Sequence, residues 1–73
     1  MKNEKLINKL KKEQAKLDKK LLKLASFIAD QQDSQTISKY HLNLLREQLN
    51  AMWKYSEVLT MRISDLEENG DND

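Results

Sequence analysis

The 73-residue sequence contains no cysteine and no proline, only one glycine, and few aromatic residues. Without cysteine, the chain has no disulfide, no thiolate metal site and no cysteine nucleophile. Its one histidine, His41, cannot form an imidazole-rich metal site alone, and we interpret it as a surface or interface residue. Because glycine and proline are the residues of tight turns, their near absence argues against a β-sheet and predicts an all-α fold.

A chain of this length buries only about 60% of the surface that its unfolded form exposes, so its own core is small. Such domains are usually stabilised by disulfides, by a metal or by oligomerisation. Since the composition excludes disulfides and offers few metal ligands, oligomerisation is what remains.

Long hydrophobic runs and enzyme signatures are also missing. No apolar run approaches the ~18–20 residues of a membrane span, and no signal-peptide apolar stretch follows the basic amino terminus. There is no glycine-rich phosphate loop, no HExxH motif and no nucleophile–base motif. We therefore expect a cytoplasmic protein that has no membrane partner, needs no cofactor or metal, and is not an enzyme.

Two helical patterns flank one polar segment, and they predict an antiparallel hairpin over residues 1–66. We expect one helix at about residues 4–31, a loop at about 32–38 and a second helix at about 39–66, with Ser38 or Thr36 as the N-cap. Residues 67–73 contain no apolar side chain and are predicted to form an acidic disordered tail. The predicted seams consist of Leu6, Leu10, Leu17, Leu21, Leu24 and Ile28 in the first helix, and of Leu45, Leu49, Met52, Ser56, Leu59, Ile63 and Leu66 in the second.

The second helix has more apolar surface than one partner helix can cover. A further apolar stripe lies beside its seam, and other large apolar residues lie around the rest of its circumference. A single hairpin would leave this surface exposed, so we predict a homo-oligomer of hairpins, with a twofold dimer as the simplest form. The residues concerned are Leu44, Ala51, Tyr55 and Val58 in the stripe, and Tyr40, Trp53 and Met61 elsewhere.

The net charge of +1 conceals a strong asymmetry. Residues 1–28 carry nine lysines against three acidic residues, a net charge of +6, and residues 29–73 carry four basic against nine acidic residues, a net charge of −5. The simplest interpretation is two solvated helix faces. The alternative is that the first helix attracts or binds an anion. Duplex nucleic acid is a poor fit, because the second half is acidic and no helix-turn-helix spacing is present.

Two basic residues stand among apolar neighbours. Lys20 lies in the frame of the first seam; its stem could pack while its ammonium group reaches water, it could pair with Glu13, or it could meet an anionic ligand. Arg62 follows Met52 and Tyr55 along one flank of the second helix, where it could form an interface salt bridge or bind phosphate. Tyr55 is either a packing residue or a surface on which a base stacks.

Three segments together resemble a known family. Residues 17–28 match Leu-x-x-Lys-Leu-x-Lys-Leu-x-x-Phe-Ile, residues 44–52 match Leu-Leu-x-x-Gln-x-x-x-Met, and residues 55–63 match Tyr-x-x-Val-Leu-x-x-Arg-Ile. This order and spacing resembles the hairpin domain shared by phage anti-CBASS protein two and the anti-Thoeris sponges. The resemblance covers about residues 10–66. The additional chain of the anti-Thoeris relatives is missing, which favours the anti-CBASS branch.

The resemblance implies a phage-encoded sponge that acts in the host bacterial cytoplasm. Its relatives are helical hexamers that sequester cyclic di- and trinucleotides without cleaving them, so that the immune effector is not activated. By resemblance, Lys20 and Arg62 contact phosphate, and Tyr55 and Met52 stand at positions that contact ligand or only pack. The family's base-stacking aromatic has no counterpart in residues 1–19; Lys5 or Leu6 occupies that place, with Trp53 and Tyr40 as possible substitutes.

Two other functions fit the same pattern. A helical adaptor or antitoxin-like hairpin would inhibit a host protein through its exposed apolar stripe. A nonspecific polyanion binder would use the lysine face of the first helix, with a steep salt dependence.

Overall fold

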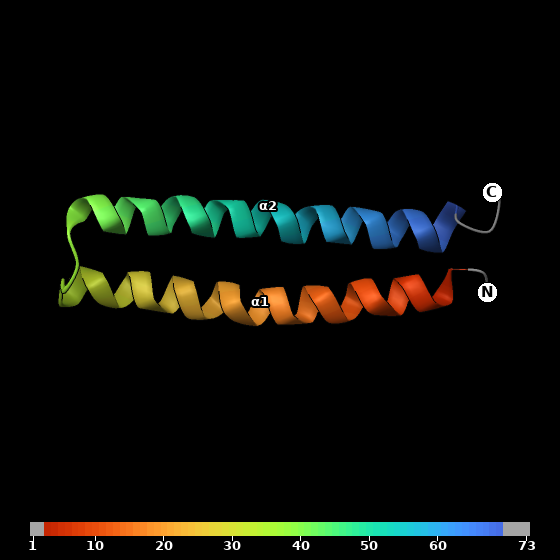
Figure 1. The fold of residues 1–73 in the computed structure, drawn as a ribbon, viewed down its shortest axis with the longest axis horizontal. Helices are drawn as coiled ribbons and strands as arrows, with labels where there is room; N and C mark the ends of the chain where they lie inside the picture. Colours follow the sequence, from red (N-terminus) through yellow and green to blue (C-terminus); the bar gives the residue numbers. More distant parts are fainter. Residues whose placement is uncertain (1–2, 70–73) are drawn as a thin grey trace.

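The computed structural model describes residues 3–69, which form two long helices joined by one short loop. Helix α1 comprises Glu4–Asp33 and helix α2 comprises Lys39–Asn69. The helices lie side by side and antiparallel, so the start of α1 lies at the same end of the rod as the end of α2 (Figure 1). The rod measures 52 × 15 × 12 Å. The predicted all-α hairpin is therefore confirmed.

Both helices end later than the sequence pattern predicts. Helix α1 continues to Asp33, and α2 includes Glu67, Glu68 and Asn69, which were predicted to belong to a disordered tail. Two contacts explain this correction. The Glu67 carboxylate pairs with Lys11 of α1 at 3.2 Å, and the Asn69 amide donates to Asp65 one turn earlier. The remaining tail residues, 70–73, lie outside the described residues.

Side-chain hydrogen bonds fix the connection between the helices. The Ser38 hydroxyl accepts a hydrogen bond from the backbone N–H of His41 at 3.0 Å, so Ser38 is the N-cap of α2, as predicted. Thr36, the alternative cap, instead bonds Gln31, whose side-chain oxygen accepts the N–H groups of Thr36 and Ile37 at 2.8 and 3.3 Å. Gln31 is buried. A glutamine of α1, rather than glycine or proline, therefore holds the loop.

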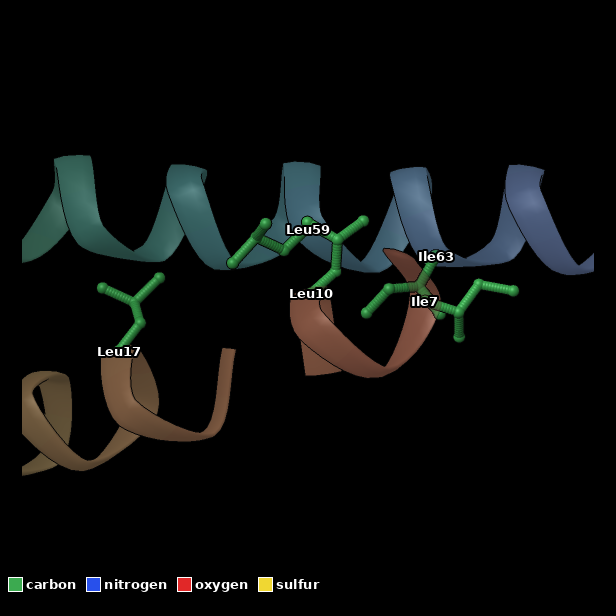
Figure 2. Close-up of a cluster of buried hydrophobic side chains, with 5 residues drawn as sticks. All are labelled: Ile7, Leu10, Leu17, Leu59 and Ile63. Carbon is green, nitrogen blue, oxygen red and sulfur yellow. The ribbon is translucent and has the colours of Figure 1, made fainter. Parts of the chain in front are cut away.

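The core is a single seam between the helices. Figure 2 shows the side chains of Ile7, Leu10 and Leu17 directed from α1 toward Leu59 and Ile63 of α2. The prediction that Leu6 belongs to the seam is wrong, because Leu6 is 40% exposed and the neighbouring Ile7 is buried in its place. The other buried apolar residues are Leu21, Ile28 and Leu42, while Met52 and Leu66 are partly buried against the cluster.

Helix geometry alone does not decide between Leu6 and Ile7. Leu6 and Ile7 precede Leu10 by four and three residues, and both spacings keep a residue within one turn of the seam. At 100° per residue, Leu6 and Ile7 lie equally far, about 50°, to either side of the direction midway between Leu10 and Leu21. The apolar spacing alone therefore leaves the two positions nearly equivalent, and the helix rotation decides between them.

A polar network crosses the middle of this apolar seam. The Gln14 amide donates to the Ser56 carbonyl at 2.9 Å and to the Thr60 hydroxyl at 2.7 Å. The Ser56 hydroxyl, which is buried, donates to Asp18 at 2.8 Å. Because only one register brings these donors and acceptors together, the network fixes how far α2 is displaced along α1.

Replacing Ser56 with alanine is expected to lower the free energy of unfolding by about 0.5–1.5 kcal/mol, because Asp18 loses a partly buried donor. Ser64→Ala is the matched control, since Ser64 is exposed on the same helix. Urea unfolding followed by circular dichroism compares the two variants. Equal unfolding midpoints for both would contradict a stabilising role of the network.

Candidate functional site

One side of the hairpin is marked by a contact between Tyr55 of α2 and Glu13 of α1. The Tyr55 hydroxyl donates a hydrogen bond to the Glu13 carboxylate, while the tyrosine side chain remains 45% exposed. We call this side of the hairpin the tyrosine face. The polar network of Gln14, Ser56 and Thr60 lies on the other side of the seam, since Thr60 is about 140° from Tyr55 around α2.

The tyrosine face also carries Lys20 and Arg62. Lys20 follows Glu13 by seven residues and Arg62 follows Tyr55 by seven residues. Seven residues are two helical turns, so each basic residue lies on the same side as the residue it follows. Both side chains are exposed, and among residues 3–69 neither has an ion-pair partner. Two of the predicted site residues are thus unpaired cations on one face.

A single hairpin does not bring these two cations together. Because the helices are antiparallel, Lys20 and Arg62 lie on opposite sides of the Tyr55 level, each about 10 Å from it along the rod. Their separation along the axis is therefore about 20 Å. No single phosphate group can contact both residues of one chain.

Apolar side chains surround the two cations on this face. Each of them is separated from Glu13 or Tyr55 by close to a whole number of turns, and each is exposed. The tyrosine face is therefore a mixed surface of apolar and charged side chains. These apolar residues are Leu6 and Phe27 from α1, and Leu44 and Val58 from α2.

The two remaining predicted site residues lie apart from Lys20 and Arg62. Met52 is half-buried and packs against the core cluster, which gives it a structural role in the hairpin. Lys5 is exposed in the first turns of α1. It precedes Glu13 by eight residues, which turns it about 80° away from the tyrosine face. Lys5 belongs instead to the outer surface of α1.

The outer surface of α1 is a lysine face. One lysine of this helix, Lys11, is turned toward α2 and pairs with Glu67. The lysines of the outer surface are exposed and have no ion-pair partner among residues 3–69. Such a face keeps the helix solvated and raises the local concentration of small anions. Its members are Lys5, Lys12, Lys16, Lys19 and Lys23, and Lys9, four residues before Glu13, lies at its border with the tyrosine face.

The two aromatic residues considered as base-stacking substitutes do not join Tyr55. Trp53 precedes Tyr55 by two residues, or about 200°, and lies on the opposite side of the hairpin. There it lines a shallow hollow of about 210 Å³ with Asp18 and Leu22. Tyr40 is highly exposed in the first turn of α2, about 22 Å along the axis from Tyr55.

The contact that organises the tyrosine face was missed from the sequence. Glu13 was recognised only as a charged residue in a seam position and as one possible partner of Lys20. The register of the antiparallel helices sets it against Tyr55 instead.

Within residues 3–69, no group of three or more His, Cys, Asp or Glu side chains could hold a metal ion, and neither helix is long and apolar enough to cross a membrane.

Comparison with known proteins gives one match. The family model described as Sequestin matches residues 4–65, which include all of α1, most of α2 and every residue of the tyrosine face. Searches of the curated proteins and of the solved structures found no match.

Proposed function

The chain belongs to the Sequestin family, and from this membership we propose that it binds and sequesters cyclic di- and trinucleotide second messengers between copies of itself. The family name denotes sequestration, which is a binding function rather than catalysis. A sequestering protein acts stoichiometrically, so it needs affinity and abundance but no catalytic group. The resemblance to the phage anti-CBASS sponges supplies the ligand class, the phage origin and the bacterial cytoplasm as the place of action.

One observation carries the proposal: the unpaired Lys20 and Arg62 share an exposed face with Tyr55 and several exposed apolar side chains. A second hairpin can pack on this face antiparallel to the first, about a twofold axis at the level of Tyr55. Since Lys20 and Arg62 are equally far from Tyr55 along the rod, this packing brings Arg62 of the second copy level with Lys20 of the first.

Lys20 of one copy and Arg62 of the other form a pair of cations that matches the chemistry of a cyclic nucleotide. The ligand carries one negative charge per phosphate, and the Arg62 guanidinium and Lys20 ammonium are suited to bind these groups. Tyr55 and the neighbouring apolar residues offer flat and apolar area to the bases. The twofold axis repeats the pair, so a ligand with two phosphates meets two equivalent sets of cations. Further copies could build the hexamer that the resemblance implies.

A melting scan with a panel of cyclic di- and trinucleotides tests the proposed function. A ligand that binds only the folded protein stabilises it, by about 2.7 kcal/mol at a concentration 100 times its dissociation constant. We expect at least one ring size to raise the melting temperature. Linear dinucleotides with the same bases serve as the control for charge alone. The absence of a shift with every cyclic ligand would contradict the proposal.

The second candidate is a helical module that binds a host protein. Exposed apolar residues that lie away from the tyrosine face favour it, above all Leu22 and Trp53, which are 63% and 53% exposed. This function gives no melting shift with any nucleotide. The affinity for the host protein is also unchanged by Lys20→Ala and Arg62→Ala, and this result separates the second candidate from the first.

A further inference from the structure

The closed end of the hairpin contains a second hollow, distant from the tyrosine face. It has a volume of about 390 Å³ and lies between the last turn of α1, the loop and the first two turns of α2. Its wall includes Leu42 and Gln31, both buried. Because Gln31 holds the loop through hydrogen bonds with Thr36 and Ile37, this part of the wall is fixed before any ligand arrives.

The two charged residues that line this hollow are both positive. Lys39 and Arg46 line it together with the amide side chains of Gln32, Gln35 and Asn43, and no carboxylate is among the lining residues. Arg46 donates one hydrogen bond to the neutral Asn43 side chain, at 3.3 Å, and neither cation forms an ion pair within residues 3–69. Lys54 of the same helix, by contrast, pairs with Glu57 at 3.3 Å.

The spacing of the two cations indicates the size of the anion. Lys39 and Arg46 are seven residues apart, so they lie on one side of α2, about 10 Å apart along its axis. Asn43 lies between them. Long, flexible side chains at this separation reach two linked anionic groups without strain, whereas a single small ion would contact only one of them well. The guanidinium group also favours a planar pair of phosphate oxygens.

We propose that this loop-end pocket binds a small molecule containing two linked phosphate groups. Arg46 holds one phosphate, Lys39 holds the other, and the amide groups of Gln32 and Asn43 donate to oxygens between them. The positive end of the α2 dipole adds a smaller contribution of the same sign. The pocket lies within one hairpin, so this binding does not depend on Lys20, Arg62 or assembly of copies.

Titration of the ¹⁵N-labelled protein with sodium pyrophosphate tests this site. At constant ionic strength, the largest amide shifts are expected between residues 31 and 46, with saturation. Arg46→Gln and Lys39→Gln are each expected to weaken binding about tenfold, as for a lost charged hydrogen bond. Lys12→Gln is the matched control, because it removes one exposed, unpaired charge from the lysine face and should leave the affinity unchanged.

Circular dichroism of each variant confirms that the helices are intact, so a lost signal reports on binding. Shifts spread along the lysine face, shifts reproduced by sodium chloride, or equal affinities for Arg46→Gln and Lys12→Gln would each overturn the proposal. A failure here leaves sequestration at the tyrosine face untouched, since that function is measured with cyclic ligands and with Lys20 and Arg62 variants.

Discussion

Replacing Leu59 with alanine is expected to lower the free energy of unfolding by roughly 2–5 kcal/mol, the cost of removing a fully buried leucine. Leu59 has no exposed surface and belongs to the cluster that joins the two helices. Substitution leaves a cavity opposite Leu10 that a straight helix cannot collapse to fill. Because domains of this size have small stability margins, we expect a large fraction of the chain to unfold.

Leu22→Ala is the control for Leu59→Ala, since it makes the same chemical change at a side chain that is 63% exposed. Urea unfolding followed by circular dichroism at 222 nm, at one protein concentration, compares the variants. We expect the Leu22 variant to unfold near the wild-type midpoint. If both variants unfolded at the same concentration of urea, the core assigned to this hairpin would be wrong.

Arg62→Ala and Lys20→Ala are each expected to lower the affinity for cyclic nucleotides by about tenfold to a hundredfold, which corresponds to 1.5–3 kcal/mol for a hydrogen bond to a charged group. Both side chains are exposed and unpaired in the hairpin, so their loss should not weaken the fold. Because of the twofold symmetry, each substitution removes two contacts per bound ligand. We therefore expect the loss of affinity to lie toward a hundredfold.

Calorimetric titration of wild-type protein and of the two variants measures this loss. Lys12→Ala is the control, because it removes one exposed charge on the lysine face and lies away from the tyrosine face. A loss that Lys12→Ala reproduced would indicate only long-range attraction of the anion. Unchanged affinity in both Arg62→Ala and Lys20→Ala would exclude the tyrosine face as the binding site.

Local chemistry explains which parts of the fold could be predicted. The three- and four-residue spacing of leucines predicts two helices and most of their seam, and the hydroxyl of Ser38 predicts where α2 begins. Leu6 and Ile7 show the limit of this approach: both are apolar and adjacent, and only the rotation of α1 decides that Ile7 is buried. The continuation of α2 beyond Leu66 involves an ion pair between Glu67 and Lys11, a residue 56 positions earlier.

The candidate site could be predicted less well, because it depends on contacts between the helices. The sequence suggests Lys20 and Arg62 separately, from their apolar neighbours. That they share one face follows from the bond between Tyr55 and Glu13, which local patterns do not reveal. The loop-end pocket escaped prediction for a similar reason: Gln32 and Arg46 belong to different helices and meet only when the chain folds back.

The central claim is that copies of this chain share and hold an intact cyclic nucleotide. Calorimetric titration with a panel of cyclic di- and trinucleotides tests this claim most directly. After the titration, the bound ligand is released by heat and identified by chromatography. We expect saturable binding with fewer than one ligand per chain at the tyrosine face, and recovery of the ligand unchanged. Absence of binding by every member of the panel, or recovery of a cleaved product, would contradict the claim.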